Sequence, residues 1–266
     1  MNGIRRLAGP VVVALGALAA SLAHAGACDV ESGATRLPVL ELYTSEGCNS
    51  CPPADRWLSR EFGRPGTTPH AIPLAYHVDY WNRLGWPDRF SSPDYSARQQ
   101  RVAARNRSNT IYTPQFVFDG RDVRPHEFAD EIAARARGAA ADKPRAHITV
   151  RAIPGERRET RVSGEVRIDR DELRSRARIY VVLYQNGLST QVTAGENGGK
   201  RLTHDFVVRR VAGPFTPDAS GRVALDVRLP APQEFDPAKS GVLVHAEDAV
   251  DGSTLQAVTT AICHAG

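Results

Sequence analysis

The sequence predicts an α/β domain followed by an all-β domain. Its 266 residues exceed one average domain, and 41% hydrophobic with 24% charged residues is typical of folded proteins with a sizeable core. In the first half, apolar strand-like stretches alternate with helical ones. In the second half, strand-like stretches recur with turn residues between them. We therefore predict the α/β domain at residues 36–142 and an all-β domain at residues 145–263.

Residues 1–25 have the three parts of a secretory signal peptide. Two arginines precede an apolar stretch at residues 11–22, and Ala-His-Ala at residues 23–25 forms the cleavage site. The apolar stretch is too short to span a bilayer. We expect a periplasmic or secreted protein without a transmembrane segment, in a compartment where disulfides persist. An alternative is a lipoprotein site that ends at Cys28, which would then be acylated.

The elements of the first domain follow in order. Strands are predicted at 37–43, 71–79 and 115–119, with a return to 123, and helices at 52–58, 93–107 and 125–141. Pro52 and Pro53 fit only the first turn of a helix. Ser92 is followed by Pro and Asp, a helix start signal, and Asp119-Gly120 is a hairpin turn.

The four cysteines divide into two pairs by their spacing. Cys48 and Cys51 form a C-x-x-C and can pair locally, which leaves Cys28 with Cys263. The second bridge would close a loop of more than 200 residues. In the loop-entropy account such a bridge stabilises the fold by roughly 5 kcal/mol. We expect Cys28–Cys263 to be structural.

The C-x-x-C stands between a strand and a helix. This order predicts Cys48 at the helix N-terminus, where free N–H groups and the helix dipole favour a thiolate. We expect a lowered thiol pKa for Cys48 as the nucleophile, with Cys51 less exposed as the resolving thiol. The alternative is a tight structural disulfide without redox activity.

Polar and aromatic residues follow the second strand. His77 and Asp79 alternate with Val78, so their side chains share one face. His77 could accept a proton from Cys51 or ligate a metal beside the thiols. The alternative is a hydrogen-bonded pair of His77 and Asp79 that orients the following segment. Trp81 is a candidate lid residue, although aromatic residues at a strand end also simply pack.

Charge gives little evidence for a nucleic-acid partner. The net charge is +4, and the positive residues are spread along the chain. Arg98, Arg101 and Arg105 repeat at helical spacing, which we interpret as a solvent-exposed helix face.

Seven strand-like stretches indicate an immunoglobulin-like β-sandwich in the second domain. They lie at 147–152, 161–168, 179–185, 202–210, 223–229, 242–246 and 255–262. The glycine-rich segment 195–199 is predicted to be a hairpin loop. His204 and Asp205 suggest a contact with a site, without an assigned role.

Four segments together resemble a known family. They are 44–55 (TSEGCNSCPPAD), 76–81 (YHVDYW), 112–115 (YTPQ) and 195–205 (GENGGKRLTHD). They are similar to secreted, thioredoxin-like bacterial proteins grouped as domain-of-unknown-function family 1223 (DUF1223).

The resemblance implies a thioredoxin fold for the first domain. It places Cys48 and Cys51 at the redox position and Pro114 as a cis-proline facing them, with Thr113 presenting its backbone to a bound peptide. Two departures stand out: Asn-Ser replaces the Gly-Pro of thioredoxins between the cysteines, and residues 80–112 form an insertion.

Three functions are compatible with these features. The first is an exported thiol–disulfide oxidoreductase that needs no metal or organic cofactor and acts on a protein or small-molecule thiol or disulfide. The second is a Cu(I)- or Zn-binding or metal-delivering protein that uses Cys48, Cys51 and His77. The third is a non-catalytic binding module.

Overall fold

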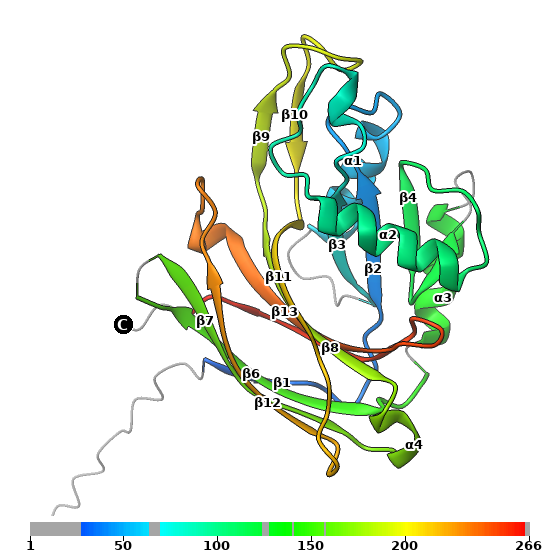
Figure 1. Cartoon of the computed structure of the whole chain (residues 1–266), viewed down its shortest axis with the longest axis vertical. Helices are drawn as coiled ribbons and strands as arrows, with labels where there is room; N and C mark the ends of the chain where they lie inside the picture. Colours follow the sequence, from blue (N-terminus) through cyan, green and yellow to red (C-terminus); the bar gives the residue numbers. More distant parts are fainter. Residues whose placement is uncertain (1–27, 64–69, 124–127, 140, 157, 264–266) are drawn as a thin grey trace, which may run out of the picture.

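The computed structural model describes residues 28–63, 70–123, 128–139, 141–156 and 158–263. The described chain forms an eight-stranded mixed sheet, a four-stranded antiparallel sheet and a two-stranded hairpin (Figure 1). The predicted signal peptide lies outside the described residues. Among the residues described, no helix is long and apolar enough to cross a membrane.

The first half has a thioredoxin-like arrangement. Its elements are β2 (Val39–Thr44), α1 (Pro52–Phe62), β3 (Ile72–His77), η1 (Asn82–Leu84), α2 (Pro93–Arg105), β4 (Gln115–Phe118), β5 (Arg121–Val123) and α3 (Phe128–Ala139). The strands lie in the order β3-β2-β4-β5; β3 runs parallel to β2 and β4 antiparallel to it.

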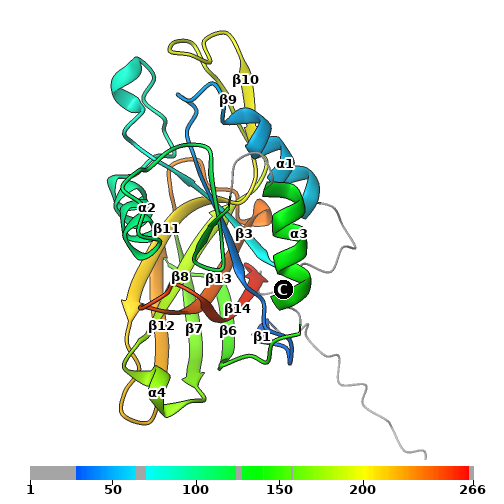
Figure 2. The ribbon, with the colours of Figure 1, turned by 90° about the vertical axis from the view of Figure 1, so that its right-hand side faces the viewer.

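The helices cover both faces of this sheet (Figure 2). Leu40 and Leu42 of β2 pack with Leu58 of α1, on the face that α3 also covers. Tyr43 points to the other face, where it shares a core with Tyr95 of α2. The alternation along β2 therefore buries both faces of the strand, as expected for a strand inside an α/β sheet.

The predicted strands and helices of the first half are confirmed. The prolines at residues 52 and 53 lie in the first turn of α1. The side chain of Ser92 caps α2 by accepting a hydrogen bond from the Asp94 N–H. The predicted start of the third helix, at residue 125, lies outside the described residues, and the helix ends at Ala139, two residues before the predicted end at 141. Residues 80–112 contain η1 and α2.

The second half consists mainly of antiparallel strands. They are β6 (Ala146–Pro154), β7 (Glu159–Ile168), β8 (Ala177–Gln185), β9 (Leu188–Gln191), β10 (Arg201–His204), β11 (Val207–Phe215), β12 (Arg222–Pro230), β13 (Ser240–Asp248) and β14 (Thr254–Ala261), with a short helix α4 (Asp171–Arg174) and η2 (Pro237–Lys239). Strand β1 (Asp29–Glu31) joins β6, β7 and β12 in the four-stranded sheet. This sheet packs on β8, β13 and β14 through a large apolar core.

The two halves share one sheet. Strand β11 pairs antiparallel with β8, and its first residue, Val207, pairs in parallel with Ala75 of β3. The eight strands therefore run β14-β13-β8-β11-β3-β2-β4-β5. A separate immunoglobulin-like sandwich was expected, but the strands of the second half continue the thioredoxin-like sheet. The domain boundary near residues 142–145 stays a prediction.

The strand predicted at residues 202–210 is two strands. Phe206 has a positive φ of 58°, which interrupts the extended backbone between β10 and β11. Strand β9 was not predicted, and it forms a hairpin with β10. The segment 195–199 lies between these strands, in agreement with the predicted hairpin loop.

Both predicted cysteine pairs are disulfides. Cys28 is bonded to Cys263, with 5.7 Å between their Cα atoms, and joins residues 235 positions apart. Because the Cys28 sulfur is part of this bond, it is not free for acylation.

Candidate functional site: the Cys48–Cys51 disulfide and the buried cluster beside it

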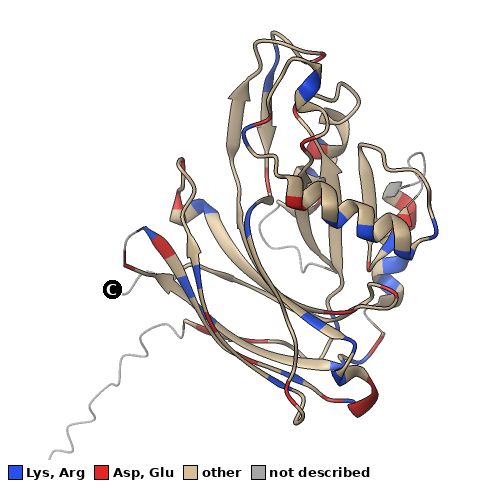
Figure 3. Ribbon diagram, viewed as in Figure 1, with Lys and Arg blue, Asp and Glu red and all other residues tan. Residues whose placement is uncertain are grey.

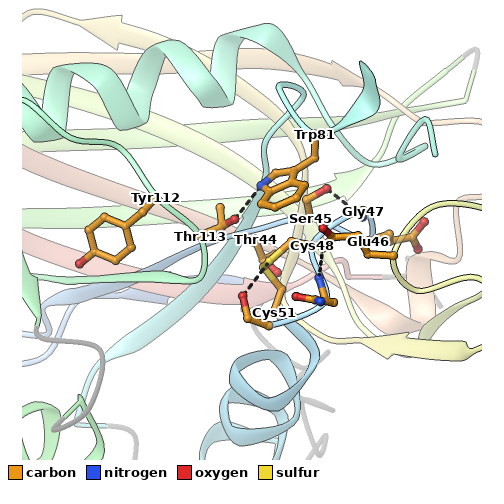
Figure 4. Close-up of a disulfide and its surroundings, with 12 residues drawn as sticks. Thr44, Ser45, Glu46, Gly47, Cys48, Cys51, Trp81, Tyr112 and Thr113 are labelled. Atoms are coloured by element: carbon orange, nitrogen blue, oxygen red, sulfur yellow. Dashed lines mark hydrogen bonds between the residues drawn. A yellow bond between two sulfur atoms is a disulfide. The ribbon is translucent and has the colours of Figure 1, made fainter. Parts of the chain in front are cut away.

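The second disulfide joins Cys48 and Cys51 in the turn between β2 and α1 (Figure 4). Cys51 is the N-cap residue of α1, and its N–H donates to the Cys48 carbonyl at 3.3 Å. Cys48 therefore lies one turn before the helix rather than at its first residue. The Ser50 hydroxyl is 3.4 Å from the Cys48 sulfur.

Both cysteines are fully buried, with 0% of each residue exposed. The expectation that Cys48 is more exposed than Cys51 is therefore wrong. The reason is that two distant segments cover the disulfide turn: the β9–β10 loop and the segment that contains Trp81.

The β9–β10 loop is fastened to the disulfide turn by hydrogen bonds. The Asn197 side-chain amide donates to the carbonyls of Glu46 and Cys48 at 2.8 and 2.9 Å, and the Asn49 N–H donates to Glu196. Asn197 is itself fully buried in a loop that is otherwise largely exposed. Figures 1 and 2 both show the β9–β10 hairpin beside the start of α1.

Trp81 lies on the other side of the turn. A Cβ placed on Gly47 would lie 3.2 Å from the Trp81 Cβ, so a side chain at residue 47 would crowd this contact. The Trp81 indole N–H donates to the Thr113 hydroxyl at 2.7 Å (Figure 4). The peptide bond between Thr113 and Pro114 is cis, as the family resemblance implied. Trp81 thus links the disulfide turn to the cis-proline segment.

His77 and Asp79 do not form the expected pair. Asp79 accepts a hydrogen bond from Ser96 of α2, at 2.5 Å. His77 is fully buried, and its Nδ1 is 2.6 Å from a carboxylate oxygen of Asp88. The pair separates because β3 ends at His77, so Asp79 lies in the turn that follows the strand.

His77 instead belongs to a buried group that we call the His204 cluster. Its members are Glu46, Asp55, His77, Asp88 and His204. His204 Nε2 is 3.3 Å from Glu46 Oε1, and His204 Nδ1 is 3.9 Å from Asp55 Oδ1. The rings of His77 and His204 meet edge to face, with centroids 4.9 Å apart.

Burial and opposite charge act against each other in this cluster. Burial alone would lower the pKa of His204, but Asp55 and Glu46 outweigh it and raise the pKa to about 10. Burial would likewise raise the pKa of Asp88, yet the charge and hydrogen bond of His77 lower it. The pKa of Glu46 is lowered because its polar contacts, with His204 foremost, outweigh its burial.

The sequence offered a metal site only as an alternative, with Cys48, Cys51 and His77 as its ligands. In this structure the two sulfurs are bonded to each other, so neither is a thiolate. The potential ligand group found among the described residues is Asp55, His77 and His204. Asp55 follows the C-x-x-C by one helical turn, and His204 had been noted without a role, but nothing local in the sequence pointed to Asp88.

The three arginines of α2 are not one solvent-exposed face. Arg98 is buried and binds Glu41 of β2 and Glu247 of β13, whereas Arg101 is exposed. Arg105 also binds Glu247, at 2.9 Å. We call these four paired residues the Arg98 cluster: Glu41, Arg98, Arg105 and Glu247. Figure 3 shows the basic residues along α2.

The fold and the disulfide turn define a thioredoxin-like protein with a C-x-x-C disulfide beside a cis-proline. The chain belongs to the family described as protein of unknown function DUF1223, whose model matches residues 39–247. No curated protein matches the sequence.

Two solved structures have a similar fold. Protein AGR_C_4864 from Agrobacterium tumefaciens is 24% identical, with a TM-score of 0.56 over 86% of this chain and 96% of that one. HBP35 of Porphyromonas gingivalis is 14% identical, with a TM-score of 0.65 over 87% of this chain and 76% of that one. At these identities the similarity concerns the fold.

Proposed function

We propose that this protein is an exported thiol–disulfide oxidoreductase that acts through Cys48 and Cys51. The observation that carries the proposal is the disulfide between these residues at the start of α1, linked through Trp81 to the cis-proline segment. A disulfide between residues three positions apart constrains the unfolded chain far less than one between residues 235 positions apart. The Cys48–Cys51 disulfide therefore adds little to the stability of the fold, and a redox role explains its presence better.

The reaction would be two exchanges of one disulfide. A thiolate of a reduced partner attacks the Cys48 sulfur, a mixed disulfide forms, and Cys51 leaves as a thiolate. A second thiolate of the partner then attacks the partner sulfur that is bonded to Cys48, and Cys48 leaves as a thiolate. The partner gains a disulfide, and its two electrons pass to the Cys48–Cys51 pair. In the opposite direction, Cys48 attacks a partner disulfide and Cys51 resolves the mixed species.

Access to the sulfurs requires movement, because both cysteines are fully buried. The covering segments are held by hydrogen bonds that include Trp81–Thr113 and those of Asn197 and Glu196. We therefore propose Trp81 as the lid. Trp81→Ala would speed the reduction of the Cys48–Cys51 disulfide by dithiothreitol. An unchanged rate would mean that the sulfurs are reached by another route.

Export is the second part of the proposal. The signal-like residues 1–25 and the two disulfides support a periplasmic or secreted location. Sequencing the N-terminus of the mature protein would test it: cleavage after Ala25 leaves Gly26 as the first residue.

The decisive experiment measures exchange and reduction potential together. The mature protein is equilibrated in glutathione buffers to obtain the potential of the Cys48–Cys51 couple, and insulin reduction by dithiothreitol is followed with and without it. We expect catalysis that Cys48→Ser abolishes. The control is the Cys28→Ser/Cys263→Ser variant, which removes the other disulfide and keeps exchange activity where it still folds.

Two results would contradict this proposal. Exchange no faster than that of Cys48→Ser would remove the enzymatic function and favour a non-catalytic binding module. Exchange that survives loss of both Cys48 and Cys51 would place the chemistry elsewhere.

A further inference from the structure

Three buried side chains from distant parts of the chain direct ligand atoms toward one another beside the disulfide turn. Asp55 comes from α1, His77 from the end of β3 and His204 from the end of β10. One N or O atom of each lies within 4.8 Å of the others, and the three residues are 6%, 0% and 2% exposed. We propose that Asp55, His77 and His204 form a binding site for a divalent transition-metal ion, with Zn²⁺ as the ion that best suits this donor set.

Buried ring nitrogens without a hydrogen bond are the first evidence. Within the described part of the chain, His77 Nε2 has no partner, and the two ring nitrogens of His204 have only ion-pair contacts, at 3.3 Å to Glu46 and 3.9 Å to Asp55. Buried polar atoms normally have one, and leaving them without costs free energy. The Asp88 carboxylate accepts hydrogen bonds, so His77 Nδ1 donates to it, and Nε2 is the atom that would offer a lone pair to a metal ion.

The second evidence is the set of partners behind the three ligands. His77 Nδ1 is held by Asp88 at 2.6 Å, and Asp55 Oδ2 accepts a hydrogen bond from the Thr44 hydroxyl at 3.0 Å. His204 Nε2 faces Glu46 at 3.3 Å, which leaves Nδ1 on the side of Asp55. Histidine ligands backed by carboxylates in this way are typical of metal sites, where the outer partner orients the ring.

The His204 cluster also has more negative than positive groups, which favours binding of a cation. Its three carboxylates, Glu46, Asp55 and Asp88, form their described ion pairs with His77 and His204 alone. Even with both histidines protonated, one negative charge would be left over within the cluster. A divalent ion supplies positive charge at the point where the lone pairs converge, and it binds neutral imidazole, so His204 would lose its proton on binding.

The spacing and the surroundings fit a small ion. Zinc bonds of 2.0–2.1 Å place tetrahedral donors about 3.4 Å apart, so binding would shorten the distances between the three ligand atoms, which lie within 4.8 Å of one another, by at most about 1.4 Å. A cavity of about 60 Å³ lies between α1 and β10, lined by Asp55 and His204 together with Arg56 and Arg201. It has room for a water as a fourth ligand.

Metal content and metal spectroscopy test the proposal independently of thiol exchange. The purified protein is stripped with EDTA, exposed to Zn²⁺, freed of unbound ion and analysed by mass spectrometry. We expect about one zinc per chain. Asp55→Asn and His77→Gln would lose it. His245→Gln, which changes a buried histidine outside the group, would retain it.

A cysteine variant separates this site from a thiolate site. Cys48→Ser/Cys51→Ser would retain zinc, and loss of zinc in that variant would overturn the proposal. Binding of Co²⁺ to the stripped wild-type protein adds a readout that does not depend on whether the Asp55 and His77 variants fold. The expected spectrum has the visible bands of nitrogen and oxygen ligation without a thiolate charge-transfer band.

Three further results would overturn the metal site: no zinc or cobalt bound by the folded wild type, a thiolate band in the cobalt spectrum, or zinc retained by folded forms of both ligand variants. None of them bears on exchange through Cys48 and Cys51, so failure of one proposal is distinguishable from failure of the other.

Discussion

The two buried charged clusters differ in how their charges are balanced. The Arg98 cluster pairs two arginines with two glutamates, and it joins α2 to strands from both halves of the chain. The His204 cluster places three carboxylates around two histidines, and several of its buried atoms form no hydrogen bond among the described residues. The Arg98 cluster shows that buried charges in this protein can be fully balanced by side chains of opposite charge. The second cluster is where the protein leaves room for a ligand.

The two clusters also contain or adjoin histidines with opposite pKa shifts. Charged partners raise the pKa of His204 to about 10. His245 stacks on Tyr180 beside the Arg98 cluster, and burial lowers its pKa to about 4. Changes in either cluster should therefore alter stability in different ways.

Removing the central cation of the Arg98 cluster has the largest expected effect. Arg98→Met leaves Glu41 buried without its ion-pair partner and Glu247 with Arg105 alone, so we expect a loss of about 3–5 kcal/mol in the free energy of unfolding. Urea denaturation measures it. Arg101→Met is the matched control, since this exposed arginine lies on the same helix, and its effect should stay within about 0.5 kcal/mol. Equal losses of unfolding free energy in Arg98→Met and Arg101→Met would contradict the role of Arg98 as the ion-pair partner of the two glutamates.

The second prediction concerns stability at alkaline pH. The pKa of His204 is raised from its ordinary value of 6.5 to about 10 by folding, so its protonation stabilises the fold fully below pH 6.5. In metal-free protein this contribution falls as the pH rises toward 10, by at most about 1.4 kcal/mol per pH unit. His204→Gln should remove this part of the slope, as measured by denaturation across that range. Bound zinc should also remove it, because the ion replaces the proton.

The third prediction has the opposite sign. The pKa of His245 is lowered from 6.5 to about 4, so its contribution is complete above pH 6.5 and declines as the pH falls toward 4. His245→Phe should reduce the acid-side slope over this shorter range and leave the alkaline slope of His204 unchanged. An unaltered acid limb would mean that other groups set the acid sensitivity.

The smallest effect is expected from Thr44→Val. This change removes the hydrogen bond to Asp55 while keeping the shape of the side chain. We expect about 1 kcal/mol of destabilisation by denaturation. If the metal site exists, zinc affinity should also fall about 10–100-fold. Affinity that stays the same would show that Asp55 needs no support from Thr44.

Local patterns were sufficient to predict much of the fold. The prolines after Cys51 mark the start of α1, the alternation of short apolar and helical stretches predicts the first half, and cysteine spacing gives both disulfides. Each of these features depends on neighbouring residues or on elimination among four cysteines. The shared sheet was not predictable in this way, because it depends on where Val207 meets Ala75.

Only those parts of the candidate site that depend on neighbouring residues in the sequence were predicted. Cys48 was identified, but its burial depends on Asn197, 149 residues away. The regular spacing of arginines in α2 looks the same whether they face solvent or, like Arg98, meet Glu41 from a strand 57 residues away. His204 reaches Asp55 only because the β9–β10 hairpin lies on α1. Contacts between residues so far apart produce no local pattern that could be recognised in one amino-acid sequence.

The pairing of β11 with β3 has a consequence for how the protein can be divided. If the chain were cut near residue 143, the first half would lose the strand beside β3 and expose backbone donors and acceptors along an apolar edge, a template for self-association. We expect the isolated first half to precipitate or to pair with copies of itself. Strand β11 and the strands that continue the sheet beyond it therefore protect the edge of β3 from pairing with another chain.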